Sequence, residues 1–265
     1  LADMAQPERM LRMLQGDVGS GKTIVALLSC CAAIEAGGQA AIMAPTEILA
    51  RQHLATITPL AEAAGIEIAI LTGREKGKTR EAILERLAHG RIDLLVGTHA
   101  LFQAPVAFKN LALGIVDEQH RFGVHQRLAL AAKGAGADIL VMTATPIPRT
   151  LVLTFFGDMD VSKLDEKPAH RLPIQTNALP MERLDQLIQR VREAVARGDK
   201  IYWLCPLVED NDELPVTSAQ ARYDSLKALM GDNVGLVHGR MKAAEKDAAM
   251  ADFKDGRTRV RGAWR

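Results

Sequence analysis

The stretch Gly16-Asp17-Val18-Gly19-Ser20-Gly21-Lys22-Thr23 decides the fold of this chain of 265 residues. It fits the pattern G-x-x-x-x-G-K-[S/T], in which glycines let the backbone curl so that successive N–H groups point inward. An apolar run at residues 10–15 precedes it, and a helical pattern at about residues 22–36 follows it. A strand that runs through a glycine-rich turn into a helix predicts a phosphate-binding loop rather than a chance cluster of glycines.

The residue types of this loop also predict its ligand. Backbone N–H groups and the positive end of the helix dipole attract phosphate oxygens. We expect Lys22 to reach the β- and γ-phosphates and the Thr23 hydroxyl to bind Mg²⁺. All eight residues from Gly16 to Thr23 are therefore candidate nucleotide ligands, for ATP or another nucleoside triphosphate with Mg²⁺. A dinucleotide-binding loop is excluded, because no G-x-G-x-x-G opens a helix.

A second signal is an apolar run, residues 113–116, that ends in the tetrad Asp117-Glu118-Gln119-His120. A buried strand that ends in two carboxylates delivers them to the sheet edge where the phosphate loop lies. We expect Asp117 to hold the Mg²⁺ and Glu118 to polarise the attacking water as the general base. An acidic helix cap is the alternative for either residue.

The rest of the chain alternates short apolar runs with helical patterns, which predicts an α/β fold with a parallel sheet covered by helices. The further runs expected in the first sheet are residues 39–44, 66–71, 92–97 and 138–143. Helices are expected from just after Thr46, a plausible N-cap, to about residue 65 and from 78 to 89. Residues 158–180 carry Pro168, Pro173 and Pro180 among mixed charges, which is typical of a connection between domains.

The expected domains are therefore residues 1–160, a linker at 161–180 and a second unit at 181–265. In the second unit we expect helices at 181–196, 218–230 and 242–253 and strands at 200–208 and 234–238. Three such repeats give a small sheet, so this unit is expected to be incomplete.

Composition narrows the functional class. The chain has 33 Lys plus Arg against 32 Asp plus Glu, a net charge of +1, which neither requires nor forbids a nucleic-acid partner. The three cysteines, Cys30, Cys31 and Cys205, form no C-x-x-C pair and fit a reducing compartment. No apolar run approaches the length that spans a bilayer, so we expect a cytoplasmic protein with no membrane partner.

The tetrad at 117–120 resembles the DExH box of superfamily 2 helicases and translocases. Segments 44–47 (Ala-Pro-Thr-Glu), 97–100 (Gly-Thr-His-Ala) and 143–146 (Thr-Ala-Thr-Pro) match that family in the same order. The extended forms at 16–23, 117–127 and 143–150 resemble the RecG family of ATP-dependent DNA helicases. The transcription-repair coupling translocases share much of this core, but Gln119 and the segment 235–241 favour the RecG family.

This resemblance implies two RecA-like domains, the second truncated, in a monomeric enzyme that uses ATP and Mg²⁺. It implies branched DNA as the partner, with reversal of forks and migration of Holliday junctions during repair and recombination. Two segments match elements that grip the sugar-phosphate backbone in related helicases: one contains Pro45 and Thr46, and the other contains Gly97, Thr98 and His99. Thr46 is equally well explained as a helix cap.

The resemblance also implies roles in coupling hydrolysis to movement. Thr143 and Thr145 match residues that link the ATP site to the second domain, and a simple turn after a strand is the alternative. His120 is expected near the γ-phosphate, unless it is only structural. Arg149 is a candidate contact to DNA or to the second domain.

Three departures from the family bear on activity. We expect the family's N-terminal wedge domain, the segment that would contact adenine and the later motifs to be missing, and the tail at 260–265 is polar where the family has an apolar strand. We expect a truncated chain that binds MgATP weakly, hydrolyses it slowly and does not unwind DNA alone. A non-catalytic, nucleotide-dependent DNA-binding fragment and an RNA helicase of the same superfamily are the alternatives.

Overall fold

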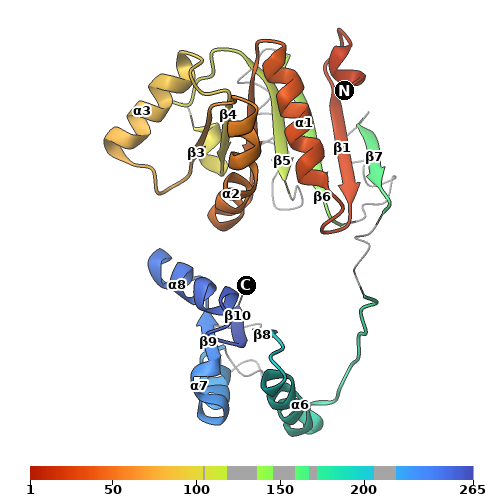
Figure 1. Cartoon of the computed structure of the whole chain (residues 1–265), viewed down its shortest axis with the longest axis vertical. Coiled ribbons are helices and arrows are strands. Elements are labelled where there is room, and N and C mark those ends of the chain that lie inside the picture. Colours follow the sequence, from red (N-terminus) through yellow and green to blue (C-terminus); the bar gives the residue numbers. More distant parts are fainter. Residues whose placement is uncertain (104, 118–135, 146–158, 167–171, 206–218, 265) are drawn as a thin grey trace, which may run out of the picture. The chain divides into compact units, whose positions relative to one another are not determined.

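The computed structural model describes residues 1–103, 105–117, 136–145, 159–166, 172–205 and 219–264. The chain divides into two compact units, Leu1–Leu172 and Pro173–Arg265 (Figure 1). Each unit has its own sheet and its own buried core. The predicted organisation as two α/β units is therefore confirmed.

The first unit is built on a parallel sheet of seven strands. Their order across the sheet is β3-β4-β2-β5-β6-β1-β7, and every described pairing is parallel. The strands are β1 (Leu11–Gly16), β2 (Gln39–Met43), β3 (Ile68–Leu71), β4 (Leu94–Gly97), β5 (Leu111–Asp117), β6 (Asp138–Thr143) and β7 (Asp160–Leu164). Six of these lie where apolar runs predicted them.

Helices cover both faces of this sheet. The α-helices are α1 (Lys22–Glu35), α2 (Glu47–Ala63) and α3 (Gly77–Ala88), with short 3-10 helices η1 (Asp3–Ala5) and η2 (His99–Phe102). Along β2, Ile42 packs in one buried cluster with residues of α1 and α2, and Met43 packs in another with Leu87 of α3. Because β2 is buried on both faces, it shows an apolar run without polar alternation.

Strand β7 lies where the sequence predicted the beginning of the linker. It pairs in parallel with β1, so that Leu164 lies opposite Gly16. Strand β7 lies at the edge of the sheet and is largely exposed, so polar residues are tolerated in it. Because it contains Asp160, Ser162 and Lys163, β7 has no apolar run that would predict a strand. Arg12 of β1 holds this strand, donating to Ser162 Oγ over 2.9 Å. The first unit therefore extends to Leu172 rather than to residue 160.

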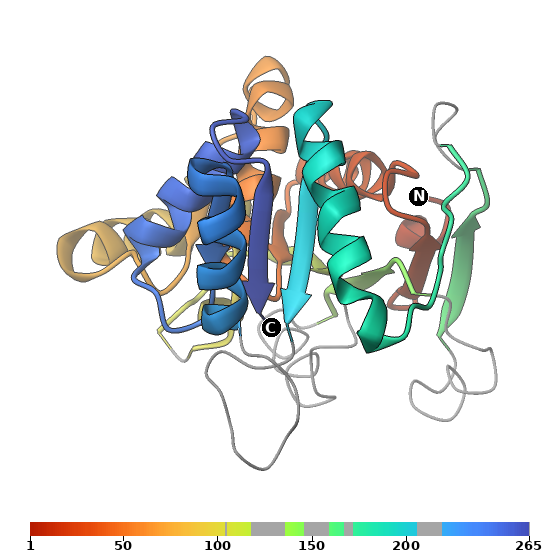
Figure 2. The same cartoon turned by 90° about the horizontal axis from the view of Figure 1, so that it is seen from below.

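The second unit holds a parallel sheet in the order β8-β10-β9. Its elements are η4 (Met181–Arg183), α6 (Leu184–Ala196), β8 (Ile201–Cys205), α7 (Ala219–Met230), η5 (Gly231–Asn233), β9 (Val234–Val237), α8 (Ala243–Lys254) and β10 (Val260–Trp264). The buried core is small: Val191, Leu226, Val234 and Val260 pack together. Figure 2 shows β8 and β10 side by side.

The polar tail forms the central strand of this second sheet. Strand β10 pairs with both β8 and β9, although its sequence differs from the apolar strand expected from the family resemblance. Val260 is fully buried, while the Arg261 guanidinium lies over the Tyr202 ring, 4.8 Å from its centroid. Backbone pairing on two sides and stacking of the arginine on an aromatic ring stabilise a strand that composition does not reveal.

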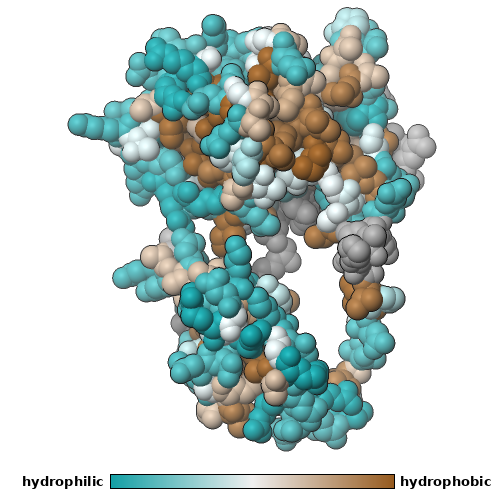
Figure 3. All heavy atoms as spheres, viewed as in Figure 1, coloured by the Kyte–Doolittle hydropathy of each residue, from teal (hydrophilic) through white to brown (hydrophobic). Residues whose placement is uncertain are grey.

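Two surface properties complete the description. Figure 3 shows apolar side chains gathered over α1, where Ile24 and Leu28 are exposed. Among the residues described, no helix combines the length and the hydrophobicity needed to cross a bilayer.

Candidate nucleotide-binding site

The predicted site residues within the described ranges lie along one edge of the first sheet. In a parallel sheet, all strands end at the same edge, and ligands bind outside these carboxyl ends. The register places Gln15 opposite Thr143, Asp117 opposite Met142, and Met43 opposite both Gly97 and Val116. The loop at 16–23 thus follows β1, residues 143–145 follow β6, and Asp117 ends β5. Segments 44–46 and 97–99 follow β2 and β4, on the other half of this edge.

The phosphate loop has a conformation that only glycine adopts easily at two positions. Gly19 and Gly21 have φ values of 83° and 95°, in the left-handed region. The carboxylate of Asp17 accepts a hydrogen bond from the Val18 N–H over 2.8 Å, and the Ser20 N–H donates to the Asp17 carbonyl over 3.1 Å. Gly21 is the N-cap of α1, so the first N–H groups of that helix face the loop.

Lys22 is held inside this loop. Its Nζ donates to the carbonyl oxygens of Gly16 and Asp17 over 2.7 Å and 2.9 Å. The ammonium group thus lies within the curl of the loop, where its positive charge can contact the phosphate oxygens of a bound nucleotide. Thr23 is half-buried in the first turn of α1.

Ser20 provides a direct test of whether the loop fits a phosphate. Its Oγ is buried and has no hydrogen-bond partner among the described residues. A buried hydroxyl without a partner is costly, and a phosphate oxygen is an acceptor that would satisfy it. The donor set of the loop therefore fits the triphosphate that the motif predicts.

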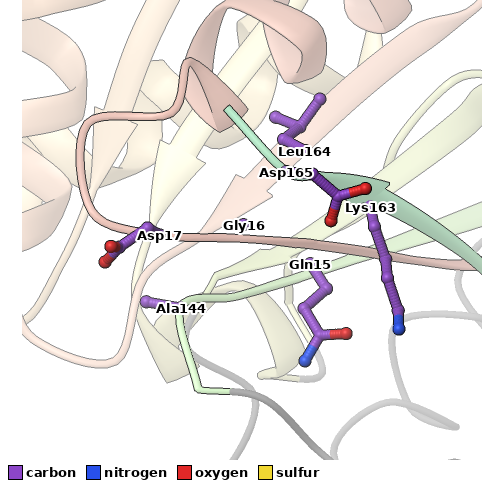
Figure 4. A pocket seen from close by; sticks show the side chains of 7 residues that line it. All are labelled: Gln15, Gly16, Asp17, Ala144, Lys163, Leu164 and Asp165. Carbon is purple, nitrogen blue, oxygen red and sulfur yellow. The ribbon is translucent and has the colours of Figure 1, made fainter. Parts of the chain in front are cut away.

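The base of the loop is closely packed against β7. A Cβ on Gly16 would lie 2.5 Å from Ser20 Oγ and 2.9 Å from Leu164 Cβ, so only glycine fits there. A pocket of about 350 Å³ opens beside this contact (Figure 4), and its lining residues are Gln15, Gly16, Asp17, Ala144, Lys163, Leu164 and Asp165. The last three were missed in the sequence, because the strand that places them carries no apolar pattern.

Asp117 contacts a histidine that the sequence did not single out. His53 Nε2 lies 2.7 Å from Asp117 Oδ2, and the two side chains are 12% and 11% exposed. His53 belongs to α2 and is 64 positions away in the sequence, so no local pattern relates the two residues. The other predicted residues of this motif, Glu118 and His120, lie outside the described residues.

The part of the chain that the structure describes holds no cluster of three or more His, Cys, Asp or Glu side chains arranged as metal ligands. Mg²⁺ bound to a nucleotide does not need such a cluster, because phosphates and water complete its octahedral shell around one or two protein ligands. Thr23 in the loop and Asp117 at the end of β5 are side chains of the right chemistry at this edge of the sheet.

The two threonines predicted to couple hydrolysis to movement contact each other. Their Oγ1 atoms are 2.9 Å apart, and the Thr145 N–H donates to Thr143 Oγ1 over 3.2 Å. The Gln15 side chain donates to the Thr145 carbonyl over 3.2 Å, so this turn is tied to the last residues of β1 before the phosphate loop. Arg149 lies outside the described residues.

The side chains of the two candidate DNA-contacting segments, 44–46 and 97–99, differ in their exposure to solvent. Thr46 caps α2, its Oγ1 accepting from the Leu49 N–H over 3.3 Å, which confirms the capping role that was one of its two explanations. Thr98 is only 5% exposed, whereas His99 is exposed at the same turn and Pro45 is half-buried. A Cβ on Gly97 would meet the Leu71 carbonyl and lie 2.9 Å from Leu101 Cδ2. Gly97 is thus required for packing.

Ion pairs fix α2 against the loop that follows β3. Arg51 pairs with Glu47 over 3.1 Å and with Glu75 over 2.9 Å, and Arg74 also pairs with Glu47. Burial acts to raise the pKa of Glu75, but hydrogen bonds from Thr72 and the charge of Arg51 outweigh it, and the net pKa is lowered. Glu75 is therefore held in its charged form.

Known proteins are similar to this chain in sequence and in fold. A protein of Escherichia coli O157:H7 named ATP-dependent DNA helicase RecG is 51% identical over 260 residues, which is 96% of this chain and 38% of that protein. The protein of the same name from Bacillus subtilis is 51% identical over 95% of this chain and 37% of its own length. This chain therefore spans a little over a third of the length of the relatives it matches.

A solved structure of RecG bound to a three-way DNA junction matches with a TM-score of 0.75 and 40% identity, over 99% of this chain and 34% of that one. The Mycobacterium smegmatis helicase Lhr, at 20% identity and a TM-score of 0.67, over 96% of this chain and 37% of that one, shares the fold. The family model for DEAD/DEAH box helicase matches residues 3–153, more than half of the chain. The chain belongs to the DEAD/DEAH box helicase family.

Proposed function

We propose that this chain supplies the ATP-hydrolysing core of a DNA helicase or translocase that acts on branched DNA. Forks and Holliday junctions, met in repair and recombination, are the proposed substrates, and we infer that the protein works as a monomer in the cytoplasm. One observation carries the proposal: a phosphate loop and Asp117 share one sheet edge with two segments suited to contact a sugar-phosphate backbone. The names of the relatives, and the solved relative bound to a DNA junction, support it.

The chemistry follows from the geometry of the loop. ATP with Mg²⁺ supplies the phosphoryl group whose transfer to water drives movement. The N–H groups of residues 16–23 and the ammonium of Lys22 bind the phosphates, and Lys22 exchanges its two carbonyl partners for phosphate oxygens. Thr23 and Asp117 hold the metal. We assign to Glu118 the role of the base that polarises the attacking water and accepts its proton, and to His120 that of a sensor of the γ-phosphate, both on the family resemblance.

The DNA-binding half of the edge reads no sequence. Pro45 and Thr46 follow β2, Gly97 is the last residue of β4, and His99 begins η2. Backbone phosphates are the same at every step, so residues at these strand ends suit contact that is independent of base identity. Thr98 contributes through its backbone, because its side chain is buried. We infer that Thr143, Thr145 and Arg149 transmit the state of the ATP site towards the second unit.

A second candidate is a non-catalytic, nucleotide-dependent DNA-binding fragment. The described part of the second unit favours it, since three strands pack on a core of four buried residues. Because so small a core gives the second unit little packing, we expect the chain by itself to bind MgATP but to unwind no DNA.

The test is phosphate release by the chain in the presence of forked DNA, duplex DNA or RNA. The Lys22→Ala variant should lose nucleotide binding, whereas Glu118→Gln should keep binding and lose turnover. Stimulation by forked DNA above RNA would support the helicase assignment. Equal ATPase activity in wild type and Glu118→Gln would refute the role of Glu118, and binding of nucleotide by Lys22→Ala at wild-type affinity would refute the site.

A further inference from the structure

His53 lies at this site although it belongs to none of the sequence motifs. Its Nε2 lies 2.7 Å from Asp117 Oδ2, and both side chains are nearly buried. A carboxylate oxygen accepts hydrogen bonds, so Nε2 carries the hydrogen and donates it. The bond fixes Oδ2 of Asp117, and the other carboxylate oxygen, Oδ1, is not bound by His53.

The helix that carries His53 comes from the other half of the sheet. Helix α2 packs on β3 and β4, whereas Asp117 ends β5, which lies beyond β2 in the strand order. Ala50, Ile57 and Ala61 of α2 are buried in the core on this face. His53 thus reaches from a firmly packed helix across the sheet edge to the acid beside the phosphate loop.

The same helix begins at the segment proposed to contact DNA. Thr46 caps α2 seven residues before His53, which at the rise of an α-helix is about 10 Å away. Hydrogen bonds along the helix and the buried side chains make this stretch a rigid connection. Such a connection would carry a shift of the capped end to the imidazole and to the carboxylate that it holds.

We propose that His53 is a positioning residue that orients the Asp117 carboxylate for Mg²⁺ and ties it to the DNA-contacting end of α2. The proposal rests on the proposed function. Partners that orient a metal ligand from behind commonly change metal affinity by about 10–100-fold when they are removed. A histidine that only filled space in the core would affect folding stability, without changing the dependence of nucleotide binding on Mg²⁺.

The experiment uses the full chain and three variants of His53. Glutamine places an amide donor close to the position of Nε2, whereas asparagine, one methylene shorter, does not reach Asp117, and alanine removes the donor. Thr56→Ala is the matched control, because Thr56 lies on the same helix and its hydroxyl bonds only to the Gln52 carbonyl one turn away, among the contacts described. Thermal unfolding reports the stability of each variant.

The first readout is binding of a fluorescent ATP analogue at increasing Mg²⁺. His53→Ala and His53→Asn should raise the Mg²⁺ concentration for half-maximal binding about tenfold. His53→Gln should restore most of the wild-type value, and Thr56→Ala should match wild type. If alanine prevents folding, the comparison of glutamine with asparagine decides. Wild-type Mg²⁺ dependence in His53→Asn and His53→Ala, or no recovery in folded His53→Gln, would overturn the proposal.

The second readout is the factor by which forked DNA changes the affinity for the analogue. Coupling between two sites is reciprocal, so the nucleotide should change DNA affinity by the same factor. In His53→Ala this factor should fall towards one, while DNA affinity without nucleotide stays at the wild-type value. An unchanged factor would overturn the link between the two sites. A wild-type chain that binds no analogue would instead refute the proposed function, and this inference with it.

Discussion

Thr46 allows the capping role and the proposed DNA-contact role to be separated by one pair of substitutions. Its hydroxyl accepts the Leu49 N–H at the start of α2, so Thr46→Ala should cost about 1 kcal/mol of folding stability. For a unit of the size Leu1–Leu172, this lowers the unfolding midpoint by about 2–4 °C. Aspartate caps helices as well as threonine does or better, so Thr46→Asp should unfold at or above the wild-type temperature.

The Thr46→Asp variant, although as stable as wild type or more so, should bind DNA more weakly than wild type. A carboxylate at this half-buried position repels a phosphate within about 4 Å by about 1 kcal/mol in a solvated setting, which is about fivefold in Kd. The loss should shrink as salt is raised, because screening weakens the repulsion. The assay is fluorescence anisotropy of labelled forked DNA at two salt concentrations, with Thr46→Ser as the control that keeps both the cap and the hydroxyl. A stable Thr46→Asp variant that binds DNA with wild-type affinity would show that Thr46 is only a cap.

Three further predictions concern the phosphate loop, the ion pairs of Glu75 and the cysteines of α1. Gly16→Ala should abolish binding of a fluorescent ATP analogue and destabilise the first unit by about 1–3 kcal/mol, since its Cβ would overlap Ser20 and Leu164; wild-type binding would disprove the close packing of the loop. The lowered pKa of Glu75 contributes stability at pH values above its unfolded pKa, and this stability is lost as the pH falls through the folded pKa. Glu75→Gln should therefore flatten the pH dependence of the free energy of unfolding in urea in the acidic range. The same pH dependence in wild type and variant would contradict this. Burial raises the pKa of Cys30, and also that of the less buried Cys31, so alkylation followed by mass spectrometry of the native protein should label Cys31 before Cys30; the reverse order would show that the core opens at α1.

The central strand of the second unit is held partly by the contact between an arginine and an aromatic ring. Arg261 of β10 stacks on Tyr202 of β8, and its Nε is buried without a hydrogen-bond partner in the described part of the chain. An unpaired buried N–H is unfavourable, so stacking on the ring has to offset that cost. The strand therefore depends on aromatic contact as well as on backbone pairing.

The sequence by itself determined the elements that local patterns encode. The glycines, lysine and threonine of residues 16–23 predicted the phosphate loop, because few other residues allow left-handed turns before a helix. Uninterrupted apolar runs predicted the strands that are buried on both faces, such as β2 and β5. Asp117 was assigned to the site because the carboxyl ends of parallel strands share one edge.

Only the tertiary structure decided the features that depend on distant partners. Strand β7 forms by pairing with β1, and β10 forms by pairing with both β8 and β9. The side chains of these two strands are too polar to predict a strand from the sequence. The contact of His53 with Asp117 joins residues 64 positions apart, and the burial of Thr98 follows from packing against neighbouring segments. Local sequence fixes which conformation a segment prefers, but the register and orientation of other strands and helices fix which side chains meet.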